Sequence, residues 1–258
     1  MKITSLLENT TTCDNMLTEH GLSLYIETKK HNILFDMGQT DLFFKNAKTL
    51  GIDLSGVDIA VLSHGHYDHG GGLKKFLEIN KKAPVYLSRY AFEPHYNGMK
   101  KYIGLDIFLI DNDRLNYTDN ITVIDEGLTL YSCNENKRDY DLGSFGLNML
   151  KDEKYAADDF RHEQYLLIEE DGKRVLISGC SHKGIIDITQ WFKPDFLIGG
   201  FHFSKLSLDK KLENYACLLN EFNTVYYTCH CTGEKQFRFM KNYMTKLNYL
   251  SCGQSIKI

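Results

Sequence analysis

The sequence predicts one mixed α/β domain in which each half begins with a run of strands and continues with alternating helices and strands. The chain has 258 residues, 43% of them hydrophobic, so it can bury a substantial core without disulfides. Only three prolines occur, and no internal repeat or low-complexity linker is found, so residues 1–258 are expected to form a single domain. Two strand-rich halves with helices outside them permit a four-layer αββα sandwich, and the same pattern permits three layers.

The first half combines apolar, β-branched runs that predict strands with segments of helical spacing. Over Asp41–Leu50 the apolar residues recur on one helical face, and Gly51 is a suitable stop. The elements expected here are strands at Ile3–Leu7, Leu22–Glu27, Asn32–Phe35, Asp58–Leu62 and Val85–Leu87, and helices at Asp41–Leu50 and Leu73–Ile79.

The second half contains two irregular stretches, near residues 89–120 and 134–160, which are expected to be insertions or a lid. Two β-rich runs flank an Asp171-Gly172 turn, which predicts a hairpin. The elements expected here are strands at Ile121–Ile124, Thr129–Ser132, Gln164–Glu169, Arg174–Ser178, Phe196–Ile198 and Val225–Thr228, and helices at Gly184–Phe192, Leu208–Phe222 and Glu234–Leu247.

Charge and composition exclude several classes of protein. The net charge of −4 argues against a nucleic-acid binder, which usually carries a basic surplus. No stretch approaches the roughly 18 consecutive apolar residues of a membrane span, so no membrane association is expected. The seven cysteines are odd in number and show no paired framework, which is typical of a reducing compartment. We therefore expect a cytoplasmic protein.

The strongest chemical signal is the segment SHGHYDHGGG at residues 63–72, which follows an apolar strand. Imidazole nitrogens and carboxylate oxygens are preferred ligands of zinc and related divalent ions. His64 and His66 are two residues apart on an extended turn and can face one ion, while Asp68 and His69 can face another. The glycines allow the backbone to approach the ions closely. This segment predicts a metal site.

Another histidine, His230, also follows a strand end and lies between Cys229 and Cys231. These cysteines can form a thiolate site with His230, but the spaced ligand pairs of a structural zinc site are missing. A sharp loop at Thr232-Gly233 favours a ligand over a core histidine.

The H-x-H-x-D-H pattern after an apolar strand resembles the signature of the metallo-β-lactamase fold superfamily. Further landmarks extend this resemblance along nearly the whole chain and are similar to the 7,8-dihydropterin-6-ylmethyl-4-(β-D-ribofuranosyl)aminobenzene-5′-phosphate synthase-like subfamily. They are residues 19–23, 34–38, 46–47, 50–52, 179–182, 199–202 and 229–233. The resemblance implies a four-layer αββα sandwich, with His64 and His66 on a first ion and Asp68, His69 and His230 on a second.

The chain departs from the common superfamily pattern after the predicted hairpin. Many members carry a bridging Asp in a Gly-Asp pair there, whereas this chain has Gly179-Cys180. We choose His182 as a ligand, and Cys180 is either a thiolate ligand or a small buried residue. Without the bridging Asp, the second ion is expected to be held less firmly. His162 falls near an earlier ligand position of the family, but the loop around it is expected to be exposed, so a ligand role is disfavoured.

Other polar residues have candidate roles near the expected site. Asp36 ends a strand and either orients a ligand histidine or serves as a turn residue. His202 is a candidate substrate or phosphate contact, or a more distant hydrogen-bonding group. Lys183, at a helix start, either helps to hold a phosphate or is solvated. His20 is expected on the rim of the site, and two further histidines are expected on the surface, His31 and His95.

These observations predict a metal-dependent hydrolase or transferase acting on a small, phosphorylated substrate. A metal-bound hydroxide would be the nucleophile, or the metal would act as a Lewis acid, with Asp68 and His202 as catalytic residues. One or two divalent ions are expected, zinc first, with iron or manganese as alternatives. The alternatives are an iron-containing redox or sensor protein on the same fold and a non-catalytic metal-binding module.

Overall fold

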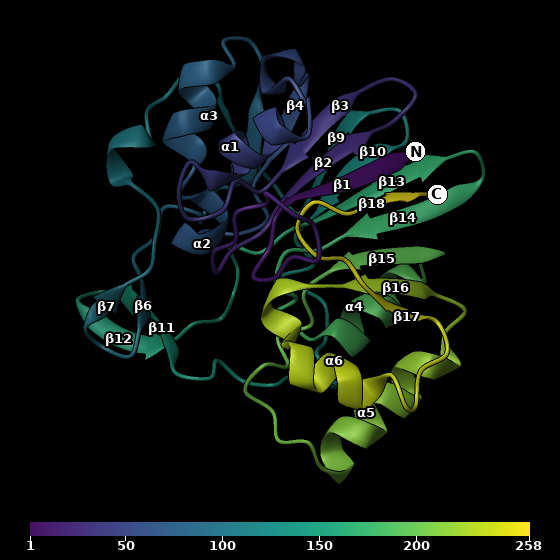
Figure 1. Ribbon diagram of the computed structural model, residues 1–258. Helices are drawn as coiled ribbons and strands as arrows, with labels where there is room; N and C mark the ends of the chain where they lie inside the picture. Colours follow the sequence, from purple (N-terminus) through teal and green to yellow (C-terminus); the bar gives the residue numbers. More distant parts are fainter.

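The computed structural model describes residues 1–258 and contains two seven-stranded sheets packed face to face (Figure 1). The first sheet has the order β18-β1-β2-β3-β4-β5-β8, so the two ends of the chain pair within it. Its strands are β1 (Lys2–Leu7), β2 (Ser23–Glu27), β3 (Asn32–Phe35), β4 (Ile59–Val61), β5 (Val85–Ser88), β8 (Leu115–Thr118) and β18 (Ser255–Lys257).

The second sheet has the order β17-β16-β15-β14-β13-β10-β9. Strands β14 to β17 run parallel to one another, so their carboxyl ends meet at one edge of the sheet. Its strands are β9 (Ile121–Asp125), β10 (Leu128–Tyr131), β13 (Tyr165–Glu170), β14 (Lys173–Ile177), β15 (Phe196–Gly199), β16 (Val225–Thr228) and β17 (Leu247–Tyr249).

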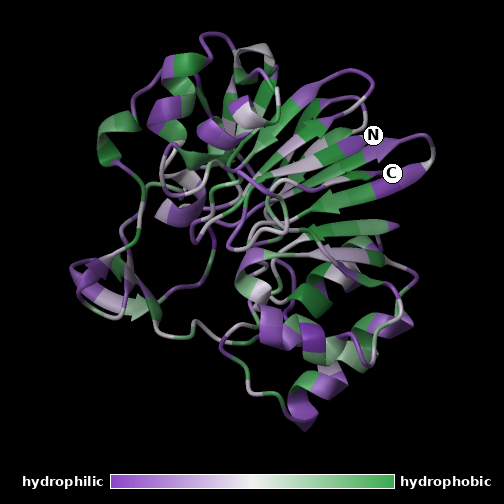
Figure 2. Cartoon of the chain, viewed as in Figure 1, coloured by the Kyte–Doolittle hydropathy of each residue, from purple (hydrophilic) through white to green (hydrophobic).

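Three apolar layers hold these sheets and helices together, and Figure 2 shows hydrophobic residues concentrated in the central strands. The first lies between the first sheet and helices α1 (Leu42–Thr49) and α3 (Leu73–Ile79), and includes Phe43 and Phe76. The second lies between the sheets, where Phe35 of one packs in the same cluster as Leu166 of the other. The third lies beneath helices α4 (Ile185–Phe192), α5 (Lys210–Glu221) and α6 (Glu234–Met240). The expected αββα sandwich is therefore confirmed, and the three-layer alternative is wrong.

The two irregular stretches form a third, four-stranded sheet beside the sandwich, in the order β12-β11-β6-β7. The first stretch contributes β6 (His95–Asn97) and β7 (Lys101–Tyr102), and the second contributes β11 (Leu147–Lys151) and β12 (Lys154–Ala157). Strand β6 pairs with β11 across about 50 residues of sequence, which no local pattern reveals.

The expected helix over Glu234–Leu247 is too long. The helix ends at Met240, and Leu247 begins strand β17, which pairs in parallel with β16. Met240, Met244 and Leu247 are all buried and recur at helical spacing, so their periodicity imitates a helix beyond its true end.

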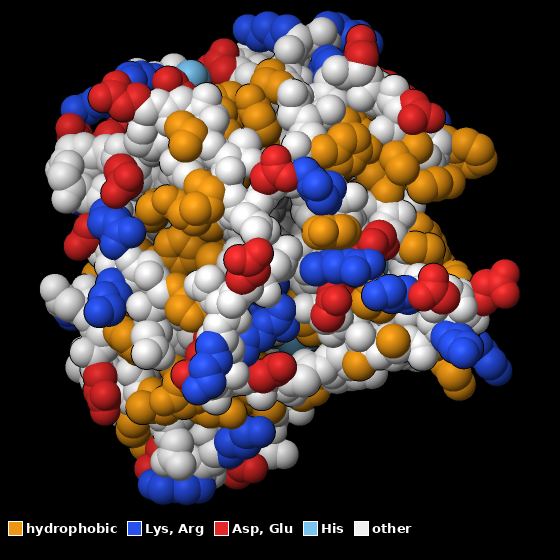
Figure 3. All heavy atoms as spheres, turned by 180° about the vertical axis from the view of Figure 1, so that it is seen from behind, with side chains coloured by type: hydrophobic (Ala, Val, Ile, Leu, Met, Phe, Trp, Pro, Cys, Tyr) orange, Lys and Arg blue, Asp and Glu red, His pale blue; other side chains and the backbone are white.

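The surface carries interspersed acidic and basic side chains on the face shown in Figure 3, in keeping with the small net charge. None of the helices has the length and apolar character needed to cross a bilayer.

Candidate metal centre

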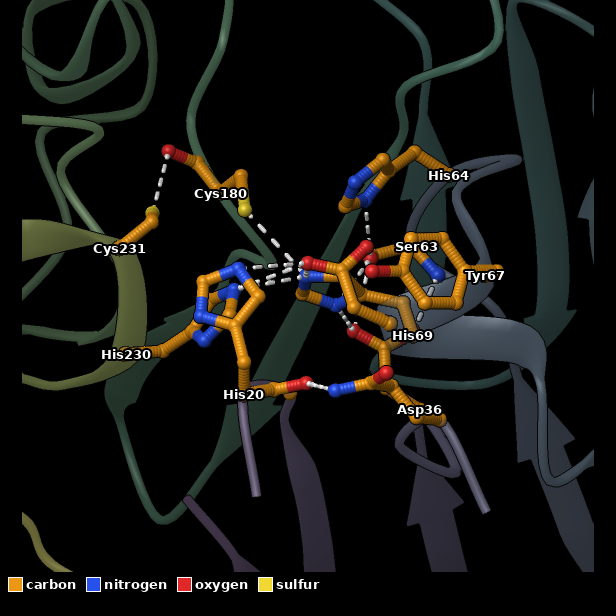
Figure 4. A network of polar contacts seen from close by, with 12 residues as sticks. His20, Asp36, Ser63, His64, Tyr67, His69, Cys180, His230 and Cys231 are labelled. Carbon is orange, nitrogen blue, oxygen red and sulfur yellow. Dashed lines mark hydrogen bonds and ion pairs between the residues drawn. The ribbon is translucent and has the colours of Figure 1, made fainter. Parts of the chain in front are cut away.

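The candidate site lies at one edge of the sandwich, where loops from both sheets meet (Figure 4). The first sheet contributes the loop after β4 and the short helix α2 (Tyr67–Gly70). The second contributes the loops that follow β14, β15 and β16. Because the carboxyl ends of parallel strands meet at one edge, residues far apart in sequence converge there. The structure brings together His64, His66, Asp68, His69, Cys180, His182, His202, His230 and Cys231.

One group of possible ligands consists of Asp68, His69 and His230, which we call the carboxylate group. His69 Nε2 lies 3.2 Å from His230 Nε2, and Asp68 Oδ2 lies 3.6 Å from His230 Nε2 and 3.9 Å from His69 Nε2. Four tetrahedral ligands at zinc bonding distance are separated by about 3.3 Å. The three atoms are therefore spaced as ligands of one ion would be.

Charge also suits this group to a cation. Burial alone would raise the pKa of Asp68, but His69, His20 and His230 hold it well below its ordinary range. The carboxylate is therefore ionised at neutral pH. Burial lowers the pKa of His69, but the carboxylates of Asp36 and Asp68 outweigh it and raise the pKa overall.

A second group, which we call the imidazole group, consists of His64, His66 and His182. Their ring centroids are 4.6 to 5.1 Å apart, and all three side chains are buried. His64 Nε2, His66 Nε2 and both ring nitrogens of His182 are buried without a hydrogen-bond partner. Buried polar atoms are normally paired, so the nitrogens of His64 and His182 fit metal ligands better than packing residues, whereas Nε2 of His66 faces Asp158 at 3.8 Å. Burial lowers the pKa of His64 and of His182 well below the ordinary value, which keeps their lone pairs available.

Cys180 lies between the two groups. Its Sγ is 3.2 Å from His69 Nε2 and lies within 4.8 Å of ligand atoms of His64 on one side and His230 on another. Burial raises the pKa of this thiol well above its ordinary value. The thiol therefore lies between the two groups and is protonated at neutral pH.

Polar partners hold the motif loop in place. Asp36 Oδ2 lies 2.6 Å from His69 Nδ1, and Asp36 also accepts hydrogen bonds from the Ser63 backbone amide and hydroxyl, both at 2.7 Å. Ser63 Oγ is 2.8 Å from His64 Nδ1. Asp36 is wholly buried, so its contacts are with the loop that carries the histidines and not with solvent.

Two residues at the end of β1 hold His230 but are not among those expected from the sequence. Glu8 Oε1 accepts a 2.6 Å hydrogen bond from the His230 backbone amide, and Asn9 Oδ1 lies 2.8 Å from His230 Nδ1. This second contact directs Nε2 of His230 toward His69. The sequence feature that could have indicated this role is the charged residue Glu8, which directly follows an apolar strand. His20 lies on the rim, with Nε2 3.3 Å from Asp68 Oδ2 and its side chain 57% exposed.

The position of His182 is set by a buried carboxylate, Glu163. Glu163 accepts hydrogen bonds from the backbone amides of His182 at 2.7 Å and Lys183 at 3.1 Å. Lys183 is itself wholly buried and donates from Nζ to the Glu163 carbonyl at 2.8 Å and to the Ser132 carbonyl. Burial lowers the pKa of Lys183 to about 8. Lys183 is therefore neither a phosphate contact nor a solvated surface lysine, and both expectations for it are wrong.

His202 lies on the rim of the site, with its ring centroid 4.3 Å from that of His182. Neither ring nitrogen has a hydrogen-bond partner, and His202 can share a ligand group with Cys180 and His182. It is half-buried and lines the cavity described below. Both nitrogens are therefore buried and unpartnered beside the cavity.

The expectation that His95 and the loop of His162 are exposed is wrong, because both side chains are completely buried. They gather with His66 around Asp158, which was not expected at the site. Burial would raise the pKa of Asp158, but His162, His66 and His95 lower it overall. The third sheet supplies His95 and covers this region, and the pairing of that sheet could not be foreseen. His31, by contrast, is half-exposed and lies 2.9 Å from Asp125.

A cavity of about 200 Å³ opens onto both ligand groups. The third sheet contributes Asn97, Lys101 and Leu147 to its walls, and Lys205 comes from the loop after β15. Lys101 Nζ lies 3.2 Å from Tyr67 Oη, and Lys205 Nζ donates to the Phe145 carbonyl at 3.0 Å. Two lysines therefore line the same cavity as the candidate ligands.

Comparison with known proteins agrees with this fold and site. Residues 18–221 match the sequence model of the metallo-beta-lactamase superfamily, and the chain belongs to that superfamily. A crystal structure of a metal-dependent hydrolase of the beta-lactamase superfamily shares 30% sequence identity, with a TM-score of 0.84 over 100% of this chain and 99% of the other.

Two relatives come from Methanocaldococcus jannaschii. One is an uncharacterized protein that is 31% identical over 257 residues, which cover 95% of this chain and 94% of the relative. The other is a 7,8-dihydropterin-6-methyl-4-(beta-D-ribofuranosyl)-aminobenzene-5′-phosphate synthase, 28% identical over 93% of this chain and 90% of the relative. The superfamily and its metal-binding fold are thereby established for this chain, together with a histidine and aspartate cluster that can bind metal.

Proposed function

We propose that this protein is a metal-dependent hydrolase or transferase that acts on a small, phosphorylated substrate. The observation that carries the proposal is the pair of adjacent, buried ligand groups, with unpartnered imidazole nitrogens, beside a cavity lined by two lysines. A non-catalytic metal module would need neither the cavity nor its lysines.

The residues present fit two divalent ions, and zinc suits the nitrogen and sulfur donors best. The imidazole group would hold one ion, the carboxylate group would hold the other, and Cys180 stands between them. Such ions would supply Lewis acidity and lower the pKa of a coordinated water. Iron and manganese are the alternatives for the same donors.

The chain's own residues have separable roles in this proposal. Asp68 is ionised and acts as a ligand, and His20 at 3.3 Å is the nearest group with which its carboxylate can exchange a proton. His202 faces the cavity with two free nitrogens and can hold a proton on the substrate side. Lys101 and Lys205 can bind the phosphate, because cationic donors form strong charge-assisted hydrogen bonds with it.

The relative named as a synthase of a 5′-phosphate supports a phosphorylated substrate. It also supports a transfer reaction as an alternative to hydrolysis. The crystal structure that is similar over its full length is that of a metal-dependent hydrolase, which supports hydrolysis. An iron-containing redox or sensor protein is the second candidate, and its support is the presence of three buried cysteines in or next to the site.

The test begins with protein purified without chelator, whose metals are counted by elemental analysis. The zinc-, manganese- and iron-loaded forms are then assayed on phosphomonoesters, phosphodiesters, lactones and thioesters. We expect about two ions per chain and turnover of a phosphorylated substrate. Iron with reversible redox absorbance and no turnover would favour the second candidate instead.

A second measurement tests the substrate class. Replacing Lys101 or Lys205 by Gln should raise KM for the phosphorylated substrate about 10-fold or more, because a hydrogen bond to a charged group contributes about 1.5–3 kcal/mol. Lys74→Gln, on the exposed face of α3, is the matched control and should leave KM unchanged. Equal KM values for all three variants would contradict the assignment of the lysines to phosphate.

A further inference from the structure

A second buried cluster shares His66 with the imidazole group, and its other members have no role in the chemistry proposed above. It consists of Asp158, His66, His95 and His162, all buried. A single carboxylate oxygen, Asp158 Oδ2, lies 2.9 Å from His95 Nδ1, 3.3 Å from His162 Nε2 and 3.8 Å from His66 Nε2. Asp158 is therefore the centre of the cluster.

Hydrogen bonding decides the protonation of His162. The backbone amide of Gly65 donates to His162 Nδ1 at 2.8 Å, so this nitrogen must carry a lone pair. A ring whose Nδ1 accepts a hydrogen bond is neutral and carries its proton on Nε2. That proton faces Asp158. His162 Nε2 lies 3.3 Å from Asp158 Oδ2, and because this nitrogen carries the proton, His162 has no lone pair there for a third metal ion.

His66 belongs to both the cluster and the imidazole group. Its Nε2 has no hydrogen-bond partner and lies 3.8 Å from Asp158 Oδ2, so the carboxylate favours the tautomer with the proton on Nε2 and leaves Nδ1 for an ion. Asp36 lies closer to His69 on the other side of the site, at 2.6 Å from its Nδ1. A carboxylate behind a ligand histidine fixes its tautomer and ring orientation and makes it a better ligand.

The turn that carries Asp158 also supports His182. Asp158 Oδ1 accepts a 2.8 Å hydrogen bond from the Phe160 backbone amide, which shapes the turn. The Phe160 ring stacks on the His182 ring, with 4.4 Å between centroids and 6° between planes. Two of the three members of the imidazole group are thus held by residues 158–160, directly after strand β12.

We propose that Asp158 is a positioning residue for the ion held by the imidazole group, and that the third sheet thereby fixes this half of the centre. His95 lies on β6 and Asp158 directly follows β12, so both come from the third sheet or its end. The strand pairing of this sheet and the orientation of His66 therefore depend on one another. The inference rests on the proposed metal centre and assigns a function to a part of the molecule outside the sandwich.

The experiment isolates each ion by removing a ligand of the other. In a His230→Ala background only the imidazole group should bind zinc, and in a His64→Ala background only the carboxylate group should. Asp158→Asn is added to each background, and Asp36→Asn is the matched control. Zinc dissociation constants are measured by competition with a chromophoric chelator, with circular dichroism to check folding.

We expect Asp158→Asn to weaken zinc binding about 10–100-fold in the His230→Ala background and to leave it unchanged in the His64→Ala background. Asp36→Asn should show the opposite pattern. If Asp158→Asn does not fold, His95→Gln removes the nearest partner of Asp158 and should weaken zinc binding in the same background by a smaller factor.

Two results would overturn the proposal while leaving the metal centre intact. One is an unchanged zinc affinity with Asp158→Asn in the His230→Ala background. The other is a third zinc ion in the unmodified protein that disappears with Asp158→Asn, since the cluster would then be a metal site itself. Failure of the unmodified protein to bind any metal would instead refute the proposed function, and this inference with it.

Discussion

The carboxylate group and the imidazole group differ in charge and in how firmly they are held. The carboxylate group contains ionised Asp68, and the outer nitrogens of its two histidines face Asp36 and Asn9 at 2.6 and 2.8 Å. The imidazole group has no anionic member, and both nitrogens of His182 lack a partner. A cation is bound more firmly where a negative charge and pre-oriented donors already exist.

This difference changes which of the two metal ions is expected to bind more tightly. Loss of the bridging Asp predicts a weakened second ion, yet the structure gives that ion the only carboxylate among the candidate ligands of the two groups, Asp68. We therefore expect the carboxylate group to bind the tighter ion and the imidazole group the weaker one.

Asp68→Ala should have the largest effect, because it removes the charge of the carboxylate group. We expect the tighter ion to be lost, with an affinity decrease above about 100-fold, because losing an outer hydrogen-bond partner alone costs about 10–100-fold. Hydrolytic activity should disappear with it. Elemental analysis and calorimetric zinc titration measure the change, and retention of both ions would show that the contrast does not depend on Asp68.

Cys180→Asp should reduce the contrast, since it places a carboxylate between the two groups. We expect the weaker ion to bind about 10-fold more tightly, equivalent to about 1.4 kcal/mol. Cys180→Ser removes the sulfur without adding charge and is the control that should show no gain. Zinc titration of the apoproteins decides the matter. Two equally tight ions in the unmodified protein, or no gain with Cys180→Asp, would mean that Cys180 is not at a bridging position.

Asn9→Ala should have a moderate effect that is confined to the carboxylate group. Asn9 holds the outer nitrogen of His230, and without it the ring can rotate or change tautomer. We expect about a 10-fold loss of affinity for the tighter ion, measured in the His64→Ala background. Asn116→Ala, on an exposed position of β8, is the control. A loss of zinc affinity at the imidazole group instead would show that His230 is a ligand of the ion held by that group.

Part of this site follows from the sequence because its residues are contiguous or stand at recognisable strand ends. His64, His66, Asp68 and His69 occupy six positions of one loop, and the ends of β14 and β16 indicate His182 and His230. The cluster around Asp158 does not follow, because it depends on the pairing of β6 with β11. Strand β6 has three residues and β12 is wholly exposed, so neither carries a periodic pattern.

The burial of a single charged residue, Lys183, could not be predicted from the sequence either. Lys183 follows a ligand candidate and precedes a helix, which locally favours solvent or an anion. Its partner is the carbonyl of Ser132, 51 residues away in a different loop. Interactions at such separation depend on the completed sandwich and leave no trace in local composition.

His20→Gln should give the smallest effect. His20 Nε2 is 3.3 Å from Asp68 Oδ2, but the side chain is 57% exposed, and pairs at such positions contribute about 0–1 kcal/mol. We expect at most about a 5-fold change in affinity at the carboxylate group and none at the imidazole group. The matched control is His31→Gln, which removes another half-exposed histidine near a carboxylate, Asp125, away from the site. A loss as large as that of Asp68→Ala would show that His20 is itself a ligand, and the carboxylate group would then have four members and hold its ion more firmly still.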